Sequence, residues 1–269
     1  MKKLFILFLL SVRLFAIDNN TTSTPTNPLA ALNLELNATS LNLGEKASVV
    51  VTSTFKDNTI KEVNDQVEWI ITPSGSVDIN GTTLTTLKDN NTTLKAKVDN
   101  VVSNAIDLDI YWEVNGHRLP PEPDETENNA TLLGIDVNNN DVRDDVERWI
   151  YKTYKDKHPI HIDIAMQAAR AYKKVLQTPE KAKEIHDEVR KPLHCQFYYE
   201  GDAKYLNDSI LVTENIVSEY FRSKIYFNTQ ERKNAYDQYD TLLSGDSYTL
   251  PSFEEEKQAC DFNTSKYEE

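Results

Sequence analysis

The chain has 269 residues, of which 27% are charged, and its formal net charge is −14 at pH 7. An acidic surface repels nucleic acid and anionic lipid and attracts cations, so we expect no nucleic-acid partner. With seven glycines in all, the sequence contains no glycine-rich phosphate loop.

Residues 1–16, MKKLFILFLLSVRLFA, have the layout of a secretory signal peptide. Lys2 and Lys3 form a basic start, residues 4–10 are apolar, and Ala16 is a small residue suited to cleavage. This run is shorter than the roughly 20 apolar residues that cross a bilayer, and no later segment approaches that length. We therefore expect an exported protein, periplasmic, at the cell surface or secreted, with no transmembrane segment after signal removal. A buried N-terminal strand or helix is the alternative interpretation.

A β-rich part follows the signal peptide. Residues 17–30 are small, polar and proline-containing, and they predict a flexible tether. Residues 31–113 then contain short runs of Val, Ile, Thr and aromatic residues, separated by turn signals such as KDN and PSG. Leu32, Leu34 and Leu36 alternate with polar residues, as in strands with one buried face. Many short strands at this spacing predict an all-β sandwich.

The order of features in this part resembles the group 2 bacterial immunoglobulin-like domains. A Leu-x-Leu segment precedes a Gly-Glu turn, a long strand ends in an aromatic residue, and the stretch VNDQVEW follows. The residues that carry the resemblance are Leu41, Leu43, Gly44, Glu45, Phe55, Val63, Asp65, Val67 and Trp69. The resemblance implies an immunoglobulin-like sandwich over 31–113 with Trp69 in its core. It also implies a module without catalytic residues, either a rigid spacer or a binder of a carbohydrate or receptor.

Residues 114–131 combine prolines with acidic residues and predict a linker. Beyond this linker, the apolar residues change from the period of strands to that of helices. This change is the clearest domain boundary in the sequence.

Residues 136–147, DVNNNDVRDDVE, resemble the twelve-residue calcium loop of EF-hands and dockerin-type repeats. Such a loop offers oxygens at positions 1, 3, 5, 7, 9 and 12, the seventh through a backbone carbonyl and the last through a bidentate carboxylate. The predicted ligands are Asp136, Asn138, Asn140, Val142, Asp144 and Glu147. This spacing predicts a solitary structural calcium site within residues 132–150, at the start of a helix.

Two positions depart from a full EF-hand. Position 6, usually a glycine with positive φ, is Asp141, and position 8, usually aliphatic, is Arg143. Aspartate tolerates positive φ at a cost of about 1 kcal/mol. The alternative interpretation is a polar turn that only caps the helix, because Asp and Asn favour turns and helix N-termini without any metal.

Residues 151–269 show the apolar spacing of helices and predict a small helical bundle. The second of its helices opens at Thr178-Pro179, a helix start signal, and Asn228 with Glu231 resembles the capping box of the last. The first three apolar stripes span residues 161–177, 178–193 and 206–225.

The two cysteines, Cys195 and Cys260, predict a disulfide that ties the helical domain together. An even number of cysteines in an exported chain favours this pairing. Two unpaired buried thiols are the alternative.

The remaining histidines, serines and acidic residues form no recognisable zinc or catalytic motif. We therefore interpret the chain as an exported bacterial binding or cell-adhesion protein. It presents its helical domain to an unidentified protein or glycan on an immunoglobulin-like spacer, and calcium rigidifies the junction. The alternative is a periplasmic enzyme with an active site in the helical domain. A deep cleft lined by clustered His, Asp or Glu favours the enzyme, and a convex or aromatic surface favours binding.

Overall fold

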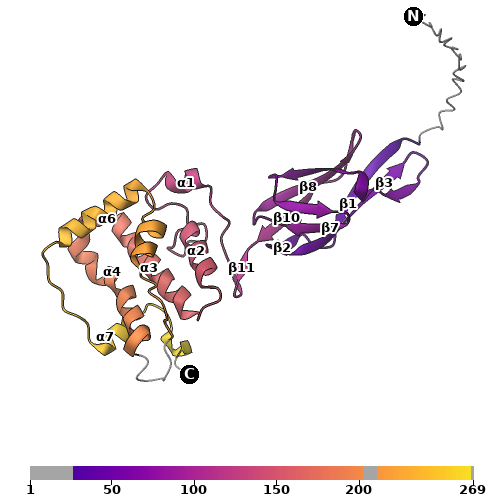
Figure 1. The fold of residues 1–269 in the computed structure, drawn as a ribbon. Coiled ribbons are helices and arrows are strands. Elements are labelled where there is room, and N and C mark those ends of the chain that lie inside the picture. Colours follow the sequence, from indigo (N-terminus) through magenta and orange to yellow (C-terminus); the bar gives the residue numbers. More distant parts are fainter. Residues whose placement is uncertain (1–26, 203–210, 268–269) are drawn as a thin grey trace, which may run out of the picture.

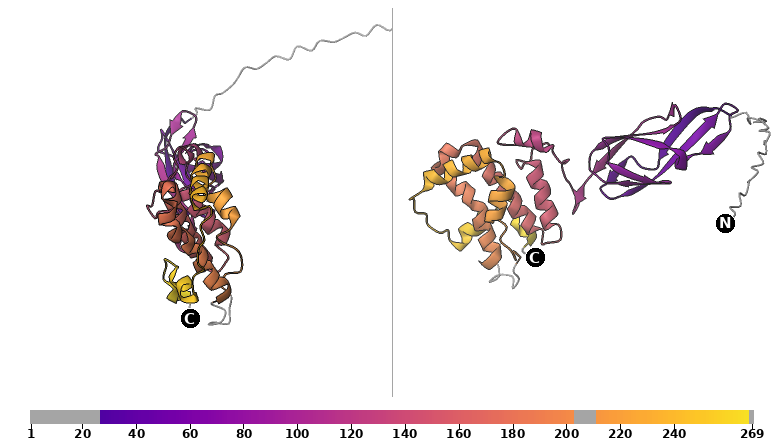
Figure 2. Two further views of the ribbon diagram at one scale, coloured as in Figure 1. Left: turned by 90° about the vertical axis from the view of Figure 1, so that its left-hand side faces the viewer. Right: turned by 45° about the horizontal axis from the view of Figure 1, so that its top comes forward.

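The computed structural model describes residues 27–202 and 211–267. A β region is followed along the chain by a helical region, and the two lie end to end in an elongated molecule (Figures 1 and 2). The predicted order of sheets and then helices is therefore confirmed. The predicted signal peptide, residues 1–16, and residues 17–26 of the predicted tether lie outside the described residues.

In the described part of the chain, two five-stranded sheets form the β region. The first consists of β1 (Leu29–Leu36), β3 (Lys46–Phe55), β4 (Ile60–Glu62), β6 (Val77–Asn80) and β7 (Thr83–Thr86). The second consists of β2 (Ser40–Asn42), β5 (Glu68–Thr72), β8 (Asn91–Val98), β9 (Val101–Val102) and β10 (Ile106–Tyr111). Their orders are β1-β3-β7-β6, with β4 beside β3, and β2-β10-β8-β5, with β9 beside β8. The second sheet is mixed, because β2 runs parallel to β10.

A hydrophobic core receives side chains from both sheets. Successive residues of a strand point to opposite faces, so alternating apolar residues give each sheet one buried face. In β1, Leu32 and Leu34 are buried, and in β8 the buried residues are Thr92, Leu94 and Ala96. The alternation that predicts strands in the sequence is therefore also what builds this core.

Trp69, expected in the core, lies on β5 and packs against the core while it stays partly exposed. The reason is that β5 is the last strand of its sheet and has its partner, β8, on one side. The expected Gly-Glu turn joins β2 to β3. Gly44 has a φ of 84°, and Glu45 Oε2 accepts a 2.8 Å hydrogen bond from the backbone N–H of Asn42.

The predicted linker, residues 114–131, is folded. It contributes most of a hairpin made of β11 (Glu113–Val114) and β12 (His117–Arg118), followed by α1 (Glu125–Asn129). The turn of the hairpin consists of Asn115 and Gly116, both with positive φ. We call residues 113–118 the junction hairpin, because they lie between the β region and the helical region (Figure 1).

The helical region is organised around one long helix, α3, which contacts α2, α4 and α6. A single core cluster joins the apolar faces of these helices. The longer helices are α2 (Asp144–Tyr154), α3 (Ile160–Gln177), α4 (Ala182–Phe197) and α6 (Gln230–Leu243). The shorter ones are η2 (Pro179–Lys181), η3 (Tyr198–Asp202), η4 (Phe221–Tyr226), α7 (Phe253–Gln258) and η5 (Thr264–Tyr267), and η1 (Asn64–Gln66) belongs to the β region.

The helix expected over residues 206–225 needs correction. Leu206 and Ile210 lie outside the described residues, and residues 211–218 contain no helix. The polypeptide is helical only just before and within η4. Apolar residues at helical spacing are equally compatible with an irregular segment that lies against a core, and Val212 and Ile216 are fully buried in this way.

Two predicted helix starts are displaced by a few residues. The α-helix expected at Thr178 begins at Ala182 after a short 3-10 turn, because the Thr178 hydroxyl donates back to the carbonyl of Lys174 at 3.2 Å. The cap of α6 is Thr229 rather than Asn228. The Thr229 hydroxyl accepts from the backbone N–H of Arg232, whereas Asn228 accepts from the Arg232 guanidinium.

The predicted disulfide between Cys195 and Cys260 is confirmed. Cys195 is fully buried near the end of α4, and Cys260 follows α7. The bond joins positions 65 residues apart and holds the C-terminal segment against the helical region.

Candidate metal site at the start of α2

Residues 136–147 form a closed loop that runs into the first turn of α2. The backbone N–H of Asp144 donates to the carbonyl of Ile135 at 2.8 Å, which joins the two ends of the loop. Asn139 and Asp141 have φ values of 55° and 67°. Position 6 therefore has the positive φ that a twelve-residue calcium loop requires, in a residue that tolerates it.

Glu147, the predicted bidentate ligand, lies where the inside of the loop meets the junction hairpin. Its side chain is fully buried. Oε2 accepts hydrogen bonds from Nδ2 of Asn138 at 3.0 Å and from Nδ2 of Asn140 at 2.7 Å. Oε1 lies 2.7 Å from Nε2 of His117. Two predicted ligands, Asn138 and Asn140, thus contact the carboxylate of a third, Glu147.

Asp136 folds back onto the backbone of the same loop. Its Oδ1 accepts from the N–H of Asn140 and its Oδ2 from the N–H of Asp141, both at 3.1 Å. Nζ of Lys173, on α3, lies 3.3 Å from Asp136 Oδ2 and 2.7 Å from Asp141 Oδ1. The lysine is the cation that neutralises this side of the loop.

Asp144 and Val142, the other two predicted ligands, are fully buried. Both carboxylate oxygens of Asp144 accept from the N–H of Val137, at 3.1 and 3.2 Å. Burial raises the pKa of Asp144 to about 6, and the neighbouring carboxylates of Asp136 and Glu147 add to the increase. A buried carboxyl with a raised pKa is a group that a cation would stabilise in its charged form.

The side chains of the loop have the chemistry of a hard cation site, with one difference in orientation. Among residues 27–202 and 211–267, no three His, Cys, Asp or Glu side chains converge closely enough to hold a metal ion. Two predicted ligands are amides, Asn138 and Asn140, and they face Glu147 through nitrogen. Rotation of each amide would exchange its nitrogen for its oxygen beside the carboxylate, and calcium requires such all-oxygen sets. Calcium would therefore require both amides to rotate from the orientation seen here.

Arg143 explains the unusual residue at position 8. Its side chain is nearly fully buried and donates to the backbone carbonyls of Ile225 at 3.1 Å and Tyr226 at 3.2 Å. Gly134 leaves the room for it, because a Cβ at this position would lie 2.2 Å from Cδ of Arg143. The arginine therefore fastens the loop to η4 of the same chain. In an EF-hand, the aliphatic residue at this position instead pairs with a second loop.

Sequence reasoning missed two residues that contact the loop, His117 and Lys173. His117 precedes Glu147 by 30 positions and Lys173 follows Asp136 by 37, so no local spacing relates them.

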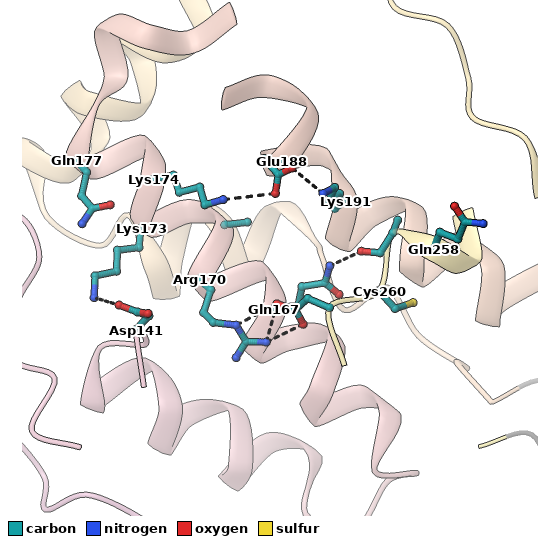
Figure 3. Close-up of a pocket in the computed structure, with 13 residues that line it drawn as sticks. Asp141, Gln167, Arg170, Lys173, Lys174, Gln177, Glu188, Lys191, Gln258 and Cys260 are labelled. Carbon is teal, nitrogen blue, oxygen red and sulfur yellow. Dashed lines mark hydrogen bonds and ion pairs between the residues drawn. The ribbon is translucent and has the colours of Figure 1, made fainter. Parts of the chain in front are cut away.

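A polar pocket of about 350 Å³ borders the loop at Asp141 and Lys173 (Figure 3). Besides Asp141 of the loop, side chains of α3, α4, α7 and the C-terminal segment line it. Its charged groups occur in ion pairs, which are Arg170–Asp261, Lys173–Asp141, Lys174–Glu188 and Lys191–Glu188. The described residues that line it include no serine and no histidine.

Comparisons with known proteins do not assign the chain to a family. No protein-family model matches it, and no curated protein gives a significant match. Within the described residues, none of the helices combines the length and the apolar character needed to cross a membrane.

Proposed function

We propose that the chain is an exported bacterial interaction protein that binds calcium in the loop of residues 136–147. The observation that carries this proposal is the position of Glu147. The predicted bidentate ligand is buried where the loop, the first turn of α2 and the junction hairpin meet. A cation bound at this point would order the start of the helical region and fix the junction.

We further infer that the β region is an immunoglobulin-like sandwich of the group 2 bacterial type and that the helical region is a bundle. Support for the sandwich comes from two sheets that share a core, the turn at Gly44 and the contact of Trp69 with the core. In this proposal the β region is the spacer and the helical region is presented to the partner. The disulfide agrees with export, because such bonds persist in oxidising compartments.

The proposed partner is a protein or a glycan. Three large side chains in the segment between α6 and α7, or at the start of α7, are exposed, namely Tyr248 by 41%, Leu250 by 78% and Phe253 by 39%. They lie within six residues of one another in the sequence, and exposed aromatic and aliphatic groups are enriched on surfaces that bind other molecules. These exposed side chains are what supports binding as the proposed role.

Calorimetric titration of the secreted full chain, first stripped with chelator, tests the calcium proposal. Exported sites of this type bind calcium with a Kd of roughly 10⁻⁴ to 10⁻³ M, so the titration must reach millimolar concentrations. Glu147→Gln should lose most of the binding, because it removes one charge from the bidentate ligand. Glu184→Gln, at a side chain of α4 that is 74% exposed, is the matched control and should bind as the wild type does. Absence of calcium heat with the wild-type chain would contradict the proposal.

A further inference from the structure

We propose that His117 is a positioning residue for calcium and that calcium, through this residue, tightens the junction hairpin against α2. The inference rests on the proposed calcium site. It adds a residue outside the loop and a consequence for the link between the two regions.

The imidazole of His117 is held in one orientation by α2. Its ring stacks on the ring of Tyr151, with centroids 4.5 Å apart and an angle of 16° between the planes. Tyr151 lies four residues after Glu147, so both are on the same face of α2. Tyr151 covers one face of the imidazole, and Nε2 at the edge of the imidazole lies 2.7 Å from Glu147 Oε1. Together these contacts fix the ring against the carboxylate.

The contact has a defined direction. An ionised carboxylate only accepts hydrogen bonds, so Nε2 of His117 carries the proton and donates it to Oε1 of Glu147. With Oε1 held by the hairpin, Oε2 faces Asn138 and Asn140 inside the loop. This places Oε2, one of the two oxygens of the predicted bidentate ligand, inside the loop.

The hydrogen bond and the ion are compatible. A bidentate carboxylate uses one lone pair of each oxygen for the metal, and the second lone pair of Oε1 stays available to the imidazole. Groups that hold metal ligands from outside are typically worth 10- to 100-fold in metal affinity. We therefore expect His117 to increase calcium affinity rather than to compete for Glu147.

The same contact connects calcium to the hairpin. Asn115, in its turn, also reaches α2, where its Nδ2 donates to the carbonyl of Lys155 at 3.1 Å. If a docked His117 raises the affinity for calcium, then bound calcium must favour the docked hairpin by the same factor. Calcium would in this way restrict movement between the β region and the helical region.

Two substitutions separate the parts of the imidazole. His117→Phe keeps a ring to stack on Tyr151 and removes the N–H donor, whereas His117→Gln keeps an N–H donor and removes the ring. In calorimetric titrations of the full chain with calcium, we expect about tenfold weaker binding for His117→Phe. His117→Gln should retain most of the wild-type affinity. His158→Phe, the same change at an exposed histidine before α3, is the matched control and should leave binding unchanged.

Hydrogen exchange of the amides of residues 113–118 supplies a second readout, independent of the affinity measurement. Calcium should slow their exchange in the wild type and in His117→Gln but not in His117→Phe. Unchanged exchange in a wild-type chain that binds calcium, or equal calcium affinity of wild type and a folded His117→Phe, would overturn this inference and leave the calcium site intact. A wild-type chain that does not bind calcium would overturn both.

Discussion

Asp144 is the residue of the loop whose protonation is most altered by folding. Its carboxyl is fully buried at the first turn of α2, and burial with nearby carboxylates raises its pKa to about 6. Because this pKa is above the ordinary value, the group stabilises the calcium-free fold below about pH 4. That contribution is lost as the pH rises through about 6. Ionised Asp144 is therefore electrostatically unfavourable at neutral pH, because Lys173 pairs with Asp136 and Asp141 and not with Asp144.

Calcium affinity should consequently fall in mild acid. Calcium binds the ionised carboxyl and must displace the proton that Asp144 holds below pH 6, which weakens binding about tenfold between pH 7 and pH 5. Calorimetry in two buffers of different ionisation enthalpy at pH 5.5 should also detect proton release. Asp144→Asn carries no titrating group at this position, and we expect a clearly smaller pH dependence from it. An equal pH dependence in wild type and variant would contradict the assignment to Asp144.

Asp141→Gly tests whether the backbone at position 6 is that of a calcium-binding loop or only that of a polar turn that caps the helix. The residue has a φ of 67°, where glycine has no penalty and aspartate costs about 1 kcal/mol. The substitution also removes the ion pair with Lys173, which is worth little because the Asp141 side chain is 71% exposed. We expect calcium affinity to be kept or increased, measured by titration beside the wild type. A large loss of affinity would mean that the Asp141 carboxylate itself takes part in binding.

The loop also shows which contacts can be predicted from residue spacing and which cannot. The sequence placed a residue that tolerates positive φ at position 6, and it placed Asn138, Asn140 and Glu147 in one predicted ligand set. The structure brings these three side chains together through hydrogen bonds from the amide nitrogens to the carboxylate. The sequence could not predict that His117 holds Glu147 or that Arg143 reaches η4. Those contacts depend on how distant elements pack, and no pattern in the neighbouring sequence encodes them.

Among the elements, α1 and α6 are joined by a buried arginine whose guanidinium, within residues 27–202 and 211–267, donates to carbonyl and amide oxygens rather than to a carboxylate. Arg232, on α6, is fully buried and donates to the backbone carbonyls of Asn128, Thr131 and Leu132 and to the side chains of Asn129 and Asn228. Burial lowers its pKa to about 10. The guanidinium thereby fastens the end of the predicted linker to the helical region.

Arg232→Met should release this segment. The substitution keeps an unbranched apolar chain but leaves several buried carbonyls without a donor, at about 1–3 kcal/mol for each one that stays dry. We expect a loss of roughly 3–5 kcal/mol in the free energy of unfolding, measured with urea, and faster proteolysis within residues 125–132. Arg118→Met, at a side chain that is 55% exposed, is the control and should cost less than about 1 kcal/mol.

Element prediction succeeded where the periodic pattern was long and failed where elements were short. The run of residues 161–177 gave α3 to within one residue, because five turns of regular apolar spacing outweigh local exceptions. The junction hairpin and α1 went unnoticed inside an apparently flexible linker. So did α7, although Ser252 and Glu255 form a capping box that its sequence, SFEE, could have revealed.

In the whole molecule, Arg148 of α2 links the two regions through a buried ion pair. Its guanidinium pairs with Asp89, which lies between β7 and β8, and donates to the carbonyl of Pro120 at 2.9 Å. It also lies 4.9 Å from the ring of Trp112 and pairs with Glu122. The side chains of Arg148 and Asp89 are only 8% and 9% exposed. A buried pair of this kind joins the β region, the linker and α2 at one point.

Arg148→Met should uncouple the two regions while each keeps its own hydrophobic core. Breaking a buried pair from one side typically costs 3–5 kcal/mol, because the remaining charge, here that of Asp89, stays desolvated. The junction can avoid this cost by opening, which lets water reach Asp89. We therefore expect the β region and the helical region to tumble with different correlation times in ¹⁵N relaxation measurements, and small-angle scattering to give a broader distance distribution. The circular dichroism of both regions should stay close to that of the wild type.

The control for this prediction lies at the same junction. Arg118→Met removes an exposed pair with Asp109, whose side chain is 40% exposed, and should leave the correlation times of the two regions equal. Equal correlation times in Arg148→Met as well would show that the hairpin contacts of His117 and Asn115 hold the regions together without the arginine. In that case calcium at Glu147, acting through His117, would be the main determinant of the junction. A third outcome is that the correlation times differ in Arg148→Met and become equal again in millimolar calcium. This result would show that the Arg148 pair and the calcium site, acting through His117, restrict the same movement.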